Sequence, residues 1–148
     1  MVKKIVVGTD GSETAGKAVD TAVQLAKLTK ADLEIVSAYA PVPESRLKAE
    51  AGASPDDVSH TVGPREDVEL ILGNAVASAK KVKVKATPHP IEGDPAEALL
   101  DTAERVGADL IVVGNRGMTG ATRFFLGSVP NRISHHSPCD VWIVHTSG

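Results

Sequence analysis

The chain has 148 residues, of which 42% are hydrophobic, and it is therefore long enough to form one domain with a buried core, which we place at residues 1–148. Only 3% of the residues are aromatic, so the core is expected to consist of Val, Ile, Leu and Ala. The formal net charge of -3, spread along the chain, is not typical of a protein that binds nucleic acid or a membrane surface.

Cysteine content and the start of the chain bear on the compartment. The single cysteine, Cys139, excludes an intramolecular disulfide, and its place between Pro138 and an apolar run favours a small, partly buried side chain over a catalytic thiol. The apolar run near the amino terminus is too short for a signal peptide or a membrane span. We therefore expect a cytoplasmic protein.

Apolar strands and amphipathic helices alternate along the chain. The β-branched run in 2–9 predicts a strand, and the apolar period of 12–29 predicts a helix with Ser12 as its N-cap. A second strand is expected at 33–38. The irregular connection 39–62 contains three prolines and is longer than most connections, so it is either a functional lid or a partly disordered segment.

The second half of the chain continues the alternation. Pro64 is expected at the first position of a helix, where its missing N–H costs nothing. The alternating lysines of 81–88 predict a strand with one solvated face at a sheet edge. Asp94 is expected to cap a helix that begins at Pro95 and ends near Gly107. The remaining expected elements are a strand at 109–113, a helix at 128–136 and a strand at 140–145.

This order of elements predicts an α/β protein. Strands that alternate with helices form a parallel sheet with helices on both faces, which is a three-layer α/β/α sandwich with right-handed crossovers. Strands that are apolar throughout fit such a sheet, because both of its faces are buried.

A glycine-rich loop, GNRGMTGATRFFLGS, joins the fourth strand to the next helix between Gly114 and Ser128. Glycines allow the backbone to approach an anion closely, and the N-terminus of a helix offers free N–H groups and a partial positive charge. Arg116 and Arg123 add positive charge and Ser128 adds a hydroxyl donor. We interpret the segment as a phosphate-binding loop, with a flexible, glycine-capped turn as the alternative.

A carboxylate, Asp10, follows the first strand in the stretch VVGTDGS. At the carboxyl end of a strand it is well placed to accept hydrogen bonds from the hydroxyls of a ribose. The alternative is that Asp10 caps the first helix together with Glu13, and the spacing does not decide between the two.

Two other signals do not support a site. The stretch GSETAGKA, residues 11–18, resembles an NTPase phosphate loop, but Ala18 stands where a magnesium-binding hydroxyl is needed and Lys17 is expected inside a helix. His135 and His136 point in different directions on a helix and suit its C-terminus better than a metal. No metal-binding residue is therefore predicted.

The sequence resembles the universal stress protein family. The nucleotide-binding motif Gly-x2-Gly-x9-Gly-Ser/Thr of that family is complete here, and the similarity extends from VVGTDGS through GDPAEALL and ADLIVVGNRG to VWIVH. The resemblance implies a Rossmann-like fold of the adenine nucleotide alpha hydrolase-like type, with a five-stranded parallel sheet in the order 3-2-1-4-5. That order places the topological switch point between strands one and four, where both Asp10 and Gly114 lie.

The resemblance also implies roles for individual residues. Asp10 would bind the ribose, the Thr9 backbone would line the site, and the Ala38 backbone would contact adenine. The phosphates would be bound by the glycine-rich loop and the start of the next helix, with two further residues alongside: Gly114, Gly117, Gly127, Ser128 and Val129, flanked by Val113 and Arg116.

The favoured function is a stress-response or signalling module that binds an adenine nucleotide, ATP first, with Mg²⁺ as a candidate companion of the phosphates. Pro130 departs from the commonest motif, so an AMP-binding or cyclic-AMP-binding sensor is an alternative, as is a nucleotide-free dimeric scaffold. No carboxylate pair for magnesium is evident, and the His- or Lys-based motif of a nucleotidyl-transfer enzyme is missing after the first strand. We therefore predict no catalytic residues, and slow ATP hydrolysis at most.

The last strand suggests a protein partner. In the implied order it is an edge strand, and its segment Val141 to Val144 carries no lysine or proline that would block pairing. We expect a homodimer through this strand, with no nucleic-acid or membrane partner. Trp142 is expected either in that contact or in the core.

Overall fold

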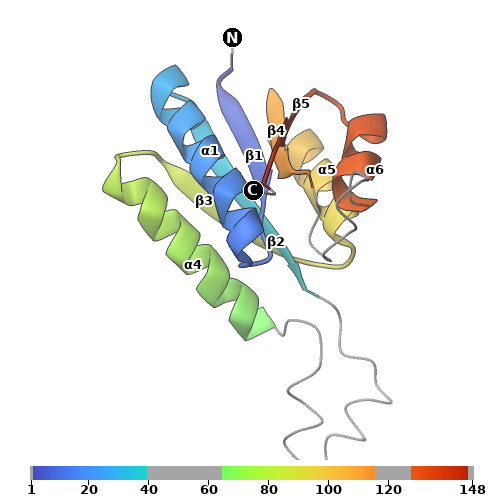
Figure 1. The fold of residues 1–148 in the computed structure, drawn as a ribbon, viewed down its shortest axis with the longest axis horizontal. Coiled ribbons are helices and arrows are strands. Elements are labelled where there is room, and N and C mark those ends of the chain that lie inside the picture. Colours follow the sequence, from blue (N-terminus) through green and yellow to red (C-terminus); the bar gives the residue numbers. More distant parts are fainter. Residues whose placement is uncertain (1, 40–64, 116–127, 147–148) are drawn as a thin grey trace, which may run out of the picture.

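The computed structural model describes residues 2–39, 65–115 and 128–146. Its centre is a five-stranded parallel sheet in the order β3-β2-β1-β4-β5 (Figure 1). This confirms the expected fold class and strand order. The strands are β1 (Lys4–Gly8), β2 (Asp32–Tyr39), β3 (Ala86–Glu92), β4 (Leu110–Gly114) and β5 (Asp140–Val144).

Helices cover both faces of the sheet, which gives the three expected layers (Figure 1). Helices α1 (Glu13–Thr29) and α4 (Arg65–Lys81) pack on one face, and α5 (Pro95–Val106) packs on the other beside α6 (Ser128–His136). Each face has its own aliphatic cluster. Fully buried members include Ile5, Val7, Leu33, Ile35 and Leu72 on the α1 side and Val6, Val36, Leu99, Ile111 and Ile133 on the α5 side.

The helix boundaries follow the capping residues in the sequence. Ser12 is the N-cap of α1, and its hydroxyl accepts a hydrogen bond from the Ala15 N–H at 3.2 Å. Asp94 caps α5 in the same way through the Glu97 N–H at 3.0 Å, and Gly107 ends that helix in the left-handed conformation. These expectations are confirmed.

The strand expected at 81–88 is wrong. Lys81 is the last residue of α4, a turn follows at 82–83, and β3 begins only at Ala86. The strand therefore contains Pro88 and Pro90, which an edge strand tolerates because one side of its backbone has no partner. The alternation of lysine and valine suggested a strand, but α4 continues to Lys81. The chain then turns at Lys83, which has φ +64°.

The sheet opens at the carboxyl end of β1. Pairing between β1 and β2 continues to Gly8 opposite Val36, and the Thr9 N–H still donates to the Val36 carbonyl oxygen at 2.9 Å. Pairing between β1 and β4 stops one residue earlier, at Val7 opposite Val112. Strand order reverses at this point, so the divergence of β1 and β4 creates the crevice in which open α/β sheets bind ligands.

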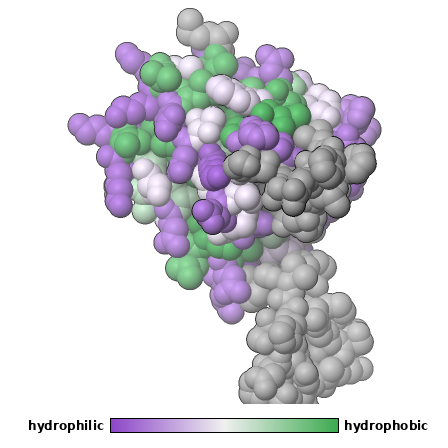
Figure 2. All heavy atoms as spheres, in the orientation of Figure 1, coloured by the Kyte–Doolittle hydropathy of each residue, from purple (hydrophilic) through white to green (hydrophobic). Residues whose placement is uncertain are grey.

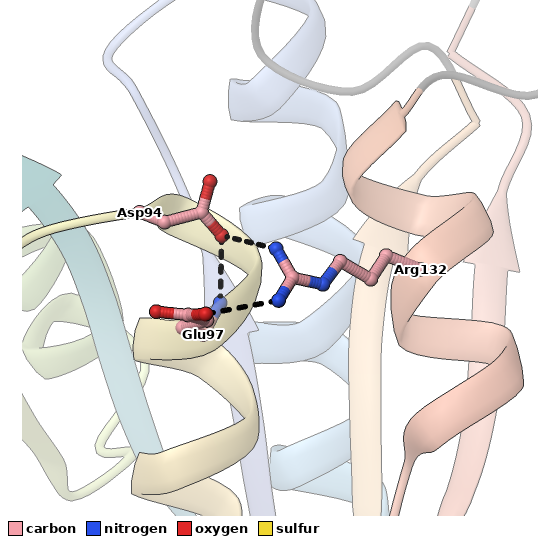
Figure 3. A network of polar contacts seen from close by, with 3 residues as sticks. All are labelled: Asp94, Glu97 and Arg132. Carbon is pink, nitrogen blue, oxygen red and sulfur yellow. Dashed lines mark hydrogen bonds and ion pairs between the residues drawn. The ribbon is translucent and has the colours of Figure 1, made fainter.

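An arginine links α6 to the start of α5. Arg132 donates to Asp94 Oδ2 at 3.1 Å through Nη1 and to Glu97 Oε1 at 2.9 Å through Nη2 (Figure 3). Because Asp94 also caps α5, the arginine joins one helix to the N-terminus of the other. This contact adds to the core packing of Val129 and Ile133 in positioning α6, whose own N-terminus faces the crevice.

Among the described residues, no helix combines the length and the hydrophobicity that a membrane crossing requires.

Candidate functional site

The crevice between β1 and β4 contains a small cavity of about 20 Å³. Strand ends, the first turns of two helices and the last described residue surround it, and its lining consists of Gly8, Thr14, Ala15, Val113, Gly114, Val129, Pro130 and Thr146. The N-termini of α1 and α6 therefore both border one space. The N-terminus of each helix carries a partial positive charge, so their combined field favours an anion at the mouth of the crevice.

Thr9 and Asp10 form the turn that leaves β1. Thr9 is 3% exposed, and its hydroxyl accepts a hydrogen bond from the Gly11 N–H at 3.1 Å. Asp10 Oδ1 accepts one from the Ser12 N–H at 2.9 Å, whereas Ser12 itself caps α1. The helix-cap alternative for Asp10 is therefore wrong, and its carboxylate shapes the turn before the cap.

This turn requires a glycine. Gly11 has φ +83°, a left-handed conformation that side chains disfavour, and an added Cβ would lie 2.8 Å from Ile71 Cδ1. Gly11 thus lets the chain reverse between β1 and α1 while α4 packs closely beside it.

The β4 side of the crevice is built by Val113 and Gly114 together with the start of α6. Val113 is buried and belongs to the core cluster on the α5 side. Ser128 is the first residue of α6 and is exposed, whereas Val129 is buried and lines the cavity. Pro130 lies in the first turn, as expected, where a missing N–H is tolerated.

Of the remaining predicted site residues, Ala38 lies near the end of β2, opposite Ile91 of β3. Ala38 therefore lies at the carboxyl ends of the strands, as Thr9 does. Arg116, Gly117 and Gly127 lie outside the described residues, as do most of the connection expected at 39–62 and residues 116–127 of the glycine-rich loop.

The carboxyl-terminal segment is a part of the site that sequence reasoning missed. Asn115 Oδ1 accepts hydrogen bonds from the Thr146 N–H at 2.8 Å and from its hydroxyl at 2.9 Å. Lys17 Nζ donates to the Thr146 carbonyl oxygen at 3.1 Å. Lys17 lies inside α1, as the sequence predicts, and not in a phosphate loop. No local motif marks Asn115, because its contact with Thr146 depends on the pairing of Gly114 with Val144.

Other reactive side chains lie elsewhere. Cys139 is partly buried, and this burial raises the pKa of its thiol above the ordinary value, as expected of a packing residue rather than a nucleophile. His135 and His136 are exposed in the last turn of α6. Within 2–39, 65–115 and 128–146, no three His, Cys, Asp or Glu side chains are grouped closely enough to hold a metal ion.

The fold defines an open-sheet α/β protein with a crevice at its topological switch point. The family model described as the universal stress protein family matches residues 1–145. Universal stress protein Rv1636 of Mycobacterium tuberculosis is 40% identical over 146 residues, which cover 98% of this chain and 97% of that protein. Universal stress protein YxiE of Bacillus subtilis is 37% identical over 149 residues, covering 97% and 99%. The chain belongs to the universal stress protein family.

Solved structures agree with this assignment. A crystal structure of a universal stress protein in complex with cAMP matches with a TM-score of 0.75 and 36% identity, covering 99% of both chains. A member of the family from Burkholderia pseudomallei matches with a TM-score of 0.71 and 29% identity, covering 97% of this chain and 96% of that one.

Proposed function

We propose that this protein binds an adenine nucleotide across the crevice between β1 and β4 and acts as a stress-response signalling module without an enzymatic cycle. The observation that carries the proposal is the convergence of two helix N-termini on one crevice at the switch point, beside the Asp10 carboxylate. A cavity of about 20 Å³ has room for about one water molecule, so the nucleotide would lie over the strand ends and above this cavity.

Each half of the site has a distinct task in this proposal. The phosphates would accept hydrogen bonds from the Gly114–Ser128 loop, the Ser128 hydroxyl and the first N–H groups of α6. Asp10 keeps Oδ1 in its turn with Ser12 and would offer Oδ2 to the ribose hydroxyls. Thr9 and Ala38 would border the nucleoside through their backbone, with Val113, Val129, Arg116, Gly117 and Gly127 completing the site.

Two ligands merit direct comparison. The complete glycine motif favours ATP, with Mg²⁺ held through the phosphates. Cyclic AMP is the second candidate, because the relative that was solved with cAMP is 36% identical to this chain over nearly its whole length. A single cyclic phosphate needs fewer N–H donors than a triphosphate, so the two ligands would depend differently on the loop.

Calorimetric titration of nucleotide-free protein with ATP, cAMP and AMP, with and without magnesium, tests the proposal. Asp10→Asn keeps the Oδ1 acceptor of the turn and removes the carboxylate charge, so we expect it to weaken the preferred nucleotide about tenfold or more. Ser12→Ala removes a helix cap but leaves Asp10 in place, and is the matched control. Binding that is equal in the wild type and in Asp10→Asn would contradict the ribose role.

The phosphate half has its own pair of variants. Ser128→Ala removes a hydroxyl at the N-terminus of α6, and Ser134→Ala removes one near its other end, where it bonds the Asn131 carbonyl oxygen at 2.8 Å. We expect only Ser128→Ala to weaken binding. A nucleotide-free wild type that binds none of the three ligands would overturn the proposal and favour the scaffold alternative.

We also propose that β5 pairs with a second copy of the chain. β5 lies at the sheet edge, and Trp142 and Ile143 on it are 44% and 36% exposed, so the core alternative for Trp142 is wrong. Exposed apolar side chains on an unpaired edge favour a twofold strand pairing.

Analytical ultracentrifugation at micromolar concentration tests the dimer. Ile143→Lys places a charge on the edge and is expected to yield a monomer. Leu28→Lys is the control, because Leu28 is 82% exposed but belongs to α1 and not to the edge strand. A monomeric wild type would contradict the proposal.

A further inference from the structure

A second candidate site lies at the opposite end of the sheet from the crevice. A groove of about 520 Å³ runs between the end of α1 and the turn that joins α4 to β3. Five lysines contribute to its lining: Lys27, Lys30, Lys81, Lys83 and Lys85. The rest of the lining consists of four apolar residues and one acidic residue: Ala26, Ala31, Val82, Val84 and Asp32. This volume is in the range of small-molecule sites.

The groove is strongly positive in a protein whose net charge is -3. All five lysines are exposed, and none forms an ion pair with a described carboxylate. Asp32 is the one acidic residue in the lining. Figure 2 shows hydrophilic and hydrophobic side chains interspersed over the upper left of the molecule. The crowding of like charges in the groove opposes folding and raises the local concentration of anions.

Helix ends explain only part of this lysine cluster. Lys27 lies in the last turn of α1 and Lys81 in that of α4, where cations favour the helix dipole. Lys30, Lys83 and Lys85 lie beyond the helices. The sequence pattern predicted Lys83 and Lys85 on an edge strand, but both precede β3 in the structure.

Two of these lysines occupy strained backbone positions. Lys30 has φ +59° and Lys83 has φ +64°, and they are the only non-glycine residues with positive φ among those described. Glycine or asparagine is preferred at such positions. Both non-glycine residues with positive φ in the described part of the chain are therefore lysines at one groove.

We propose that this lysine groove binds an anion that carries three or more phosphate groups. Positive charges come from both walls, α1 on one side and the turn before β3 on the other, so a ligand needs several anionic groups to engage both. The cations in the described lining are all lysines, and lysine binds phosphate groups as a point charge.

The test is a titration of isotope-labelled full-length protein with sodium tripolyphosphate at low ionic strength, followed by amide chemical shifts. We expect shifts at residues 26–32 and 81–85, and much weaker binding of orthophosphate. Shifts confined to Gly114, Ser128 and Val129 would place the anion in the crevice and overturn the proposal. Equal affinity for orthophosphate, tighter binding of a polyglutamate peptide, or no binding would also overturn it.

A charge-matched pair of variants isolates the groove. Lys30→Asn with Lys83→Asn removes two charges while asparagine tolerates the left-handed backbone, so the fold is expected to persist. Arg65→Gln with Arg105→Gln removes two exposed charges elsewhere, at the start of α4 and on α5. We expect about a tenfold loss of tripolyphosphate affinity in the first variant and less than about a twofold loss in the second. Equal losses of tripolyphosphate affinity in the two variants would show that only net charge matters, and would contradict a specific site in the groove.

Discussion

Asn115 binds Thr146 through two hydrogen bonds to a single oxygen, and so ties the end of the chain to the end of β4. Its Oδ1 accepts from the Thr146 N–H at 2.8 Å and from the hydroxyl at 2.9 Å. Thr146 is 2% exposed and lines the cavity in the crevice. The carboxyl-terminal segment is therefore a wall of the candidate site.

Asn115→Ala is expected to destabilise the protein by about 1–3 kcal/mol, because it leaves two buried donors of Thr146 without an acceptor. Urea unfolding followed by circular dichroism measures the change. Asn131→Ala is the control, since Asn131 is exposed on α6 and its substitution is expected to change the unfolding free energy by less than about 0.5 kcal/mol. Equal effects of the two substitutions would contradict the structural role of Asn115.

Gly114→Ala is expected to destabilise the protein by about 1–2 kcal/mol through overpacking. An added Cβ would lie 3.1 Å from Thr146 Cγ2, and Thr146 is held in place because it donates to Asn115 Oδ1 and accepts from Lys17 Nζ. Thr146→Ser removes the methyl group in that contact and keeps the hydroxyl.

Gly114→Ala is therefore expected to lower the unfolding free energy much less in the Thr146→Ser background than in the wild type. A double-mutant cycle of unfolding free energies measures this coupling. Additive effects would show that the contact with Thr146 is not the reason for a glycine at this position.

The elements that could be predicted from the sequence are those specified by local chemistry. Ser12, Asp94 and Gly107 bound their helices through their own side chain or backbone conformation, so each boundary is legible in a few residues. The apolar strands β1 and β4 were equally clear, because both faces of the sheet are buried.

The features that could not be predicted depend on contacts between distant residues or on competition between signals. At 81–88, helix propensity and a left-handed lysine overrode a strand-like alternation. The Asn115–Thr146 contact exists only because β4 and β5 pair in a particular register. The role of Asp10 could not be predicted, because Asp10 and Ser12 are both suitable N-cap residues for α1 and only the structure shows that Ser12 is the cap.

Arg132→Gln is expected to cost about 0.5–1 kcal/mol at low ionic strength and less in high salt. The Arg132 side chain is 46% exposed, and exposed ion pairs contribute little and are screened. The N-cap of α5 is retained, because the Glu97 N–H still donates to Asp94. Chemical unfolding at two salt concentrations measures the effect. A loss above about 2 kcal/mol that does not depend on salt would contradict a surface ion pair.

Asp109→Asn is expected to reduce stability at neutral pH and to have little effect in acid. The backbone N–H groups of Lys3 and Lys4 donate to Asp109 Oδ2 at 2.8 and 3.0 Å and lower the pKa of this carboxyl below its ordinary value. Its stabilising contribution is therefore complete above the ordinary Asp pKa of about 3.9 and is lost as the pH falls through the lowered value.

Unfolding free energies of the wild type and Asp109→Asn, measured from neutral pH downward, are thus expected to converge below that lowered pKa. Asp101→Asn is the control, because Asp101 is exposed on α5 and is expected to give a small difference at every pH. A difference for Asp109→Asn that stays constant with pH would show that these hydrogen bonds do not distinguish the ionised carboxylate. The link between the starts of β1 and β4 would then rest on their pairing alone.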